Sequence, residues 1–187
     1  MSVEAIYAAR KEEIVQQWTT AIFALYPFET TGFLRTQKDR FANPVGHATM
    51  VAANTLYDAV TGRPADDDQV RLALAELIRI RAIQDLTPDQ AVGALFLLKP
   101  VMRKHLLTDA LAEGALEEYL DAESRVDSLA LMAFDLYMAD KEAVFKGRVA
   151  ELRRRYSQIE RWIAAQSASD LFPDPMQAAG GSTPDKP

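Results

Sequence analysis

The chain has 187 residues, of which 49% are apolar and 26% charged, and this is the composition of a soluble globular domain with a core of its own. It contains no cysteine and two histidines, which excludes disulfides, thiolate metal sites and cysteine nucleophiles and leaves little for histidine chemistry. Its formal net charge of −6 argues against nucleic acid as the default partner.

Neither the N-terminus nor the most apolar stretch indicates a membrane. The opening segment, "MSVEAIYAARKEEIVQQW", is an amphipathic helix pattern without the continuous apolar region of a signal peptide. The longest apolar run, Ala91 to Leu98, is too short to cross a bilayer. We therefore expect a soluble, cytoplasmic protein without a transmembrane segment.

Apolar residues recur at helical spacing along most of the chain, and no segment of useful length alternates with the period of a strand. In chain order, the expected helices span residues 2–25, 44–60, 66–83, 88 onward and 116–165, with a loop at 28–40. The sequence therefore predicts an all-α fold.

Three boundaries carry specific signals. Asn43 is placed as an N-cap with Pro44 as the first helical residue, and "TPDQ" at Thr87 is a capping box followed by proline. Pro100 falls inside the helix that begins at Pro88, so we expect a kink or a break near residues 97–99.

The last expected helix, at about residues 140–165, carries a narrow apolar seam among many charges. Its apolar residues follow the spacing of a heptad repeat. They are Phe145, Val149, Leu152, Tyr156, Ile159 and Ile163. Such a stripe is typical of a coiled-coil seam and predicts a homodimer or a helical partner, although the helix could also pack on its own domain.

The two histidines are the candidates for a cofactor ligand. His47 lies in the first turn of the second helix, and His105 follows Pro100 in "LLKPVMRKHLL". The pattern around His105 is compatible both with a haem ligand and with a solvated histidine. No metal motif, phosphate-binding glycine loop or catalytic triad is recognisable. We therefore expect no enzyme activity, no metal and no cofactor, with a haem-binding globin as the alternative.

A polar cluster marks the end of the third helix. Arg81 and Asp85 are four residues apart and can pair, with Gln84 beside them, if the helix extends that far. An ordinary surface salt bridge and a cluster that holds helix ends together both remain open.

Several of these stretches together resemble a known family. "KEEIVQQW", "DRFANPVG" with Asn43, "RIRAIQDLTPDQAV" with Arg81, Gln84 and Asp85, "LLK" and "RVDSLALMAFDLYMADKE" resemble the N-terminal domain family of RsbRD-type stressosome proteins, the RsbT co-antagonists, over Ile6 to Arg155. The resemblance implies a globin-like helical fold that binds no haem, forms dimers and passes signals through its last helix into a STAS output domain.

The expected organisation is a helical sensor-like domain at residues 1–165 and a disordered tail at 166–187, rich in Pro, Gly, Ser and Asp, where the STAS domain of the family would begin. We therefore expect a free-standing signalling sensor or adaptor that acts through helix-mediated dimerisation and a protein partner. The remaining alternative is an accessory subunit that binds an enzyme or a membrane complex through the basic last helix or the tail.

Overall fold

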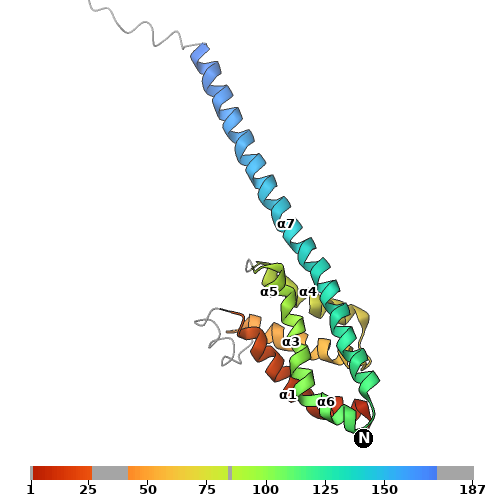
Figure 1. Ribbon diagram of the computed structural model, residues 1–187. Helices are drawn as coiled ribbons and strands as arrows, with labels where there is room; N and C mark the ends of the chain where they lie inside the picture. Colours follow the sequence, from red (N-terminus) through yellow and green to blue (C-terminus); the bar gives the residue numbers. More distant parts are fainter. Residues whose placement is uncertain (1, 27–41, 84–85, 172–187) are drawn as a thin grey trace, which may run out of the picture. The chain divides into compact units, whose positions relative to one another are not determined.

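The structure is a computed structural model that describes residues 2–26, 42–83 and 86–171 (Figure 1). Within these ranges every regular element is a helix. The helices are α1 (Val3–Phe23), α3 (Pro44–Val60), α4 (Asp67–Ile83), α5 (Pro88–Phe96), α6 (Leu98–Ala112) and α7 (Leu116–Leu171). The predictions of an all-α fold and of a long C-terminal helix are confirmed. The loop expected at 28–40 lies outside the described residues.

Local capping interactions fix the helix starts where the sequence places them. Asn43 Oδ1 accepts a hydrogen bond of 2.8 Å from the Gly46 N–H at the start of α3. In the capping box before α5, Gln90 Oε1 accepts one of 3.1 Å from the Thr87 N–H. The expected break before Pro100 falls at Leu97, between α5 and α6.

A glycine and a distant arginine together end α3. Gly62 has a φ of +74°, a conformation that glycine adopts without steric cost. Arg125 Nη1, from α7, donates to the Val60 carbonyl at 3.0 Å and so satisfies one of the acceptors that the helix end leaves open. The space beside Gly62 is therefore filled by Arg125, which lies within 3 Å of where a Cβ would stand.

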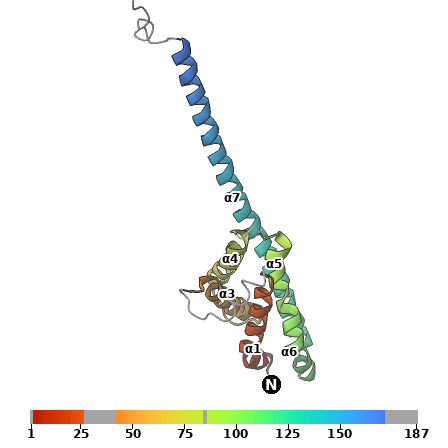
Figure 2. The ribbon, with the colours of Figure 1, turned by 90° about the vertical axis from the view of Figure 1, so that its left-hand side faces the viewer.

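The chain divides into two compact units, Met1–Lys141 and Glu142–Pro187. In the first unit, α3 packs on α4, and α1 packs on both α3 and α6, as Figure 2 shows. Trp18 is fully buried, and its Nε1–H donates to the Ala94 carbonyl at 2.9 Å. Tyr57 donates through its hydroxyl to the Tyr7 carbonyl at 3.0 Å, so buried polar groups also tie α1 to α3 and α5.

The first part of α7 belongs to the same core. It buries apolar residues at helical spacing, which are Tyr119, Ala122, Val126, Leu129, Ala130, Ala133 and Tyr137. Tyr7 donates to the Glu118 carbonyl at 3.3 Å, and Tyr137 donates to the Leu86 carbonyl at 2.7 Å. The helix then continues without interruption to Leu171, so residues 166–171 of the segment expected as a tail are helical and the rest of that segment lies outside the described residues.

Candidate functional site

The predicted seam lies on α7 in the second unit, and its large side chains are exposed. The exposed fractions are 66% for Phe145, 53% for Leu152, 66% for Tyr156, 52% for Ile159 and 52% for Ile163, whereas Val149 is half-buried. In heptad notation Phe145, Leu152 and Ile159 occupy position d, and Val149, Tyr156 and Ile163 occupy position a. These side chains form a contiguous apolar stripe that the chain itself leaves exposed to water.

Charged residues flank this seam on both sides, and only some of them are paired within the helix. Lys146 Nζ lies 2.8 Å from Glu142 Oε1, and Arg155 is paired with Glu151. In the described part of the chain, no carboxylate lies within ion-pair distance of Arg148 or Arg153. The seam is therefore bordered by arginine side chains whose charges the helix itself does not neutralise.

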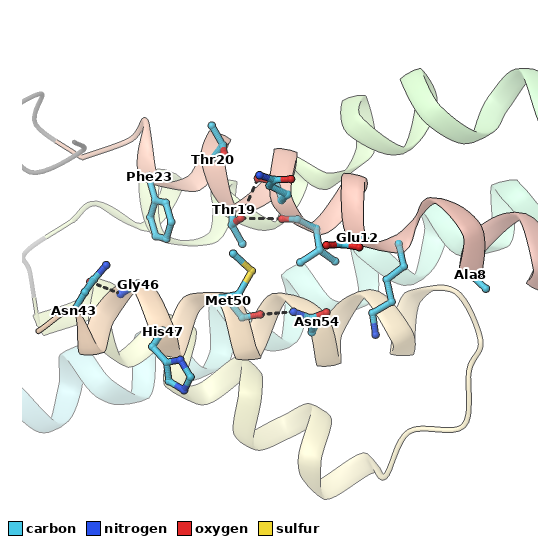
Figure 3. Close-up of a pocket in the computed structure, with 13 residues that line it drawn as sticks. Ala8, Glu12, Thr19, Thr20, Phe23, Asn43, Gly46, His47, Met50 and Asn54 are labelled. Atoms are coloured by element: carbon cyan, nitrogen blue, oxygen red, sulfur yellow. Dashed lines mark hydrogen bonds between the residues drawn. The ribbon is translucent and has the colours of Figure 1, made fainter. Parts of the chain in front are cut away.

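An open cleft of about 780 Å³ lies between α1 and α3 in the first unit (Figure 3). Phe23 from α1 and Met50 from α3 extend toward it from opposite sides. Some polar groups of its lining already form hydrogen bonds within the protein, since Asn54 Nδ2 donates to the Met50 carbonyl at 2.9 Å. Clefts of this size accommodate small molecules in other proteins.

This cleft brings together two of the residues singled out in the sequence. Asn43 and His47 both line it, Asn43 as the buried cap of α3 and His47 as an exposed side chain one turn further on. Sequence reasoning placed both residues at a helix start but did not predict the cleft, because the opposite wall comes from α1.

Arg81 is not part of the cleft, and it is fully buried. Its Nη1 donates to the Gln90 carbonyl at 3.3 Å, and its guanidinium carbon lies 5.6 Å from the centre of the Tyr26 ring. Among the described residues its Nε and Nη2 have no hydrogen-bond partner, and burial lowers its pKa. Gln84 and Asp85, the other members of the predicted polar cluster, lie outside the described residues.

His105, the other candidate haem ligand, has both ring nitrogens close to α1. Its Nε2 lies 2.9 Å from Gln17 Oε1, and its Nδ1 lies 3.5 Å from Glu13 Oε2. Its side chain is 8% exposed. A haem iron at His105 would have to displace one of these two contacts, and His47 lies on a different helix.

An ionic network between the exposed Arg103 and the buried Glu123 joins α6 to α7, and sequence reasoning missed it. Arg103 binds Glu123 through two hydrogen bonds, Nε to Oε1 at 2.7 Å and Nη2 to Oε2 at 2.9 Å. Tyr119 donates to the same carboxylate at 2.6 Å. The hydrogen bond from Arg103 is the main cause that lowers the pKa of Glu123, whereas burial raises the pKa of Tyr119. No local pattern connects residues so far apart in the chain.

The described residues hold neither a metal-binding cluster nor a membrane-spanning helix. Across residues 2–26, 42–83 and 86–171, no group of three or more histidine, aspartate or glutamate side chains is placed to hold a metal ion. Within the same ranges no helix is long and apolar enough to span a membrane.

The described residues thus form an all-helical domain whose last helix continues with exposed apolar side chains at heptad spacing. The family described as the RsbT co-antagonist protein rsbRD N-terminal domain matches residues 12–152, about three quarters of the chain, and the protein belongs to this family. The predicted family is thereby confirmed. Membership implies a signalling or regulatory role of the stressosome type, and the family is not a known enzyme family.

No curated protein and no solved structure matches the chain. The likeness to globins, which the family resemblance implied, therefore stays a prediction beyond the confirmed all-helical architecture.

Proposed function

We propose that the protein is a non-enzymatic, cytoplasmic signalling module, with residues 1–165 as its sensor-like domain, that forms a parallel homodimer through the α7 seam. The observation that carries this proposal is the exposure of the seam itself. Five large apolar side chains at heptad spacing are each more than half exposed. Removing apolar surface from water contributes about 25 cal/mol per Å². Burial of this stripe is therefore the main source of the free energy that holds the two helices together.

The arrangement of α7 supports a role in signal transfer. One uninterrupted helix supplies buried residues such as Tyr119 and Val126 to the core of the first unit and also carries the seam. A stimulus that repacks the core can therefore bias the packing of the seam, because residues of the same helix take part in both. We take the two helices as parallel, since only in a parallel pair do the structural changes in both sensor-like domains reach the same end of the helix pair.

The test replaces two seam residues with a charged one. We expect the variant Leu152→Asp with Ile159→Asp to remain folded and to become a monomer in light scattering, since a parallel pair would then bury aspartates against each other. The matched control is Ala150→Asp with Gln158→Asp, which introduces the same charges at exposed positions b and c of the same helix. We expect the control to stay dimeric.

Two results would contradict the proposal. If the Leu152 and Ile159 variant stays dimeric, the seam is not the interface, and if the unmodified chain is monomeric at all concentrations, the seam serves another purpose. Circular dichroism of both variants distinguishes loss of association from loss of the helix.

A further inference from the structure

The charges beside the seam do not match in a parallel homodimer. With Phe145, Leu152 and Ile159 at position d, Arg148 and Arg155 occupy position g, whereas Arg153 and Glu160 occupy position e. In a parallel pair, each g residue faces the e residue of the following heptad on the other helix. Arg155 then faces Glu160 of the second copy, which is favourable, but Arg148 faces Arg153 of the second copy.

Arg153 has no acidic residue of its own helix within reach, and the one carboxylate near Arg148, that of Glu151, pairs with Arg155. Positions three and four residues from Arg153 hold Val149, Ala150, Tyr156 and Ser157, none of which is acidic. Arg155 takes the one nearby carboxylate, that of Glu151. Dimerisation thus gathers two guanidinium groups from each copy around the middle of the seam without a counter-charge.

We propose that this arginine cluster, formed by Arg148 and Arg153 of both copies, is a docking site for an acidic segment of a partner protein. The inference rests on the proposed parallel dimer. Guanidinium groups bind carboxylates through paired, planar hydrogen bonds, which makes arginine the side chain best suited to an acidic peptide. The cluster is confined to one point of the seam, so it matches the few carboxylates of a short acidic segment better than the phosphates that a duplex presents along its whole length.

The consequence is coupling between partner binding and dimerisation. An acidic segment that bridges the cluster removes the repulsion between Arg148 and Arg153 of the second copy, so it binds the dimer more tightly than the monomer. By thermodynamic linkage, the partner lowers the dissociation constant of the dimer by the factor by which it binds the dimer more tightly than the monomers. Without a partner, salt has the same direction of effect, because it screens the like charges.

The test measures the dimer dissociation constant of the full chain by sedimentation equilibrium, with and without a decaglutamate peptide. For the unmodified chain we expect the peptide, and also added sodium chloride, to lower the dissociation constant. For Arg148→Glu we expect a dissociation constant about tenfold lower without peptide, because two repulsive contacts become attractive. The peptide should then have no further effect, and added salt should weaken this variant.

Arg154→Glu is the matched control, because it makes the same change of charge at position f, away from the seam. We expect it to keep both the dissociation constant and the peptide response of the unmodified chain. If Arg148→Glu and Arg154→Glu reduce the effect of the peptide equally, the proposal is overturned, because the peptide then responds to the net charge of the helix and not to the arginine cluster.

Other outcomes separate this inference from the proposed function. A dimer that Arg148→Glu does not tighten has another arrangement, such as an antiparallel pair, and this overturns the arginine cluster while the seam stands. A chain that is monomeric in every condition removes the proposed function and the cluster together. Tighter binding of a short DNA duplex than of the peptide would overturn the assignment of an acidic protein segment.

Discussion

At the scale of single residues, Glu123 shows how a buried carboxylate becomes stabilising. The residue is 9% exposed, and Arg103 and Tyr119 supply three hydrogen bonds to its two oxygens. The donors compensate the loss of water, and the hydrogen bond from Arg103 outweighs desolvation, so the pKa of Glu123 lies below its ordinary value of 4.5.

We predict that Glu123→Gln lowers the free energy of unfolding by about 1–2 kcal/mol at pH 7, near the lower end of the range for hydrogen bonds to a charged group, because water screens the exposed Arg103. Because the folded pKa is lower than the unfolded one, this stabilisation is present above about pH 4.5 and is lost as the pH falls through the folded pKa. Urea unfolding at pH 7 and at pH 3 measures the difference between variant and unmodified chain, which should shrink at pH 3.

The control for this prediction is Asp121→Asn, an exposed carboxylate on the same stretch of α7. Its effect should stay within about 0.5 kcal/mol at both pH values. A difference between Glu123→Gln and the unmodified chain that is the same at pH 7 and pH 3 would mean that the lost interaction is not ionic.

At the scale of helices, Asn43 tests how far one cap stabilises an element. Its Oδ1 accepts the Gly46 N–H at 2.8 Å in a buried setting, where water cannot replace it. We predict that Asn43→Ala lowers the free energy of unfolding by about 1–2 kcal/mol, the upper part of the range for N-caps.

The control is Asn54→Ala, later in the same helix, which removes a hydrogen bond in an exposed setting and should lower the free energy of unfolding by about 0.5 kcal/mol or less. Equal losses in the two variants would contradict a special role for the cap. Chemical denaturation monitored by circular dichroism measures both.

The helix limits could be predicted because they depend on neighbours in the chain. The bond from Gly46 to Asn43 and that from Thr87 to Gln90 each span three residues, so the sequence contains both partners within one turn. The seam was also predictable, since its spacing is a property of one helix. Its exposure could not be deduced from spacing, because an equal stripe can also pack on its own domain.

The remaining features depend on which helices become neighbours. Arg81 was expected near a helix end, but its complete burial follows from packing that no local pattern encodes. Arg103 and Glu123 are 20 residues apart, and the cleft needs walls from α1 and α3. Charged residues are almost always assigned to the surface in sequence analysis, so buried charged side chains such as Glu123 and Arg81 are the features that such analysis is least able to find.

At the scale of the whole molecule, the two tryptophans report separately on the two units. Trp18 is fully buried in the core of the first unit, and Trp162 is 62% exposed at position g beside the seam. A change that affects only association should therefore alter Trp162 and leave Trp18 unchanged. This separation allows the proposed dimer to be followed without any added label.

We predict that the fraction of tryptophan emission quenched by acrylamide falls as the protein concentration rises, because the second helix partly covers Trp162 in the dimer. Trp18, with no exposed surface, supplies a constant unquenched background. In Trp162→Phe the remaining emission should be insensitive to both acrylamide and concentration, which assigns the signal. In the variant Leu152→Asp with Ile159→Asp, Trp162 should stay quenchable at every concentration. If Trp162 also stays fully quenchable in an unmodified chain that light scattering shows to be dimeric, then the two copies associate through another surface, and the exposed seam remains available to a different partner.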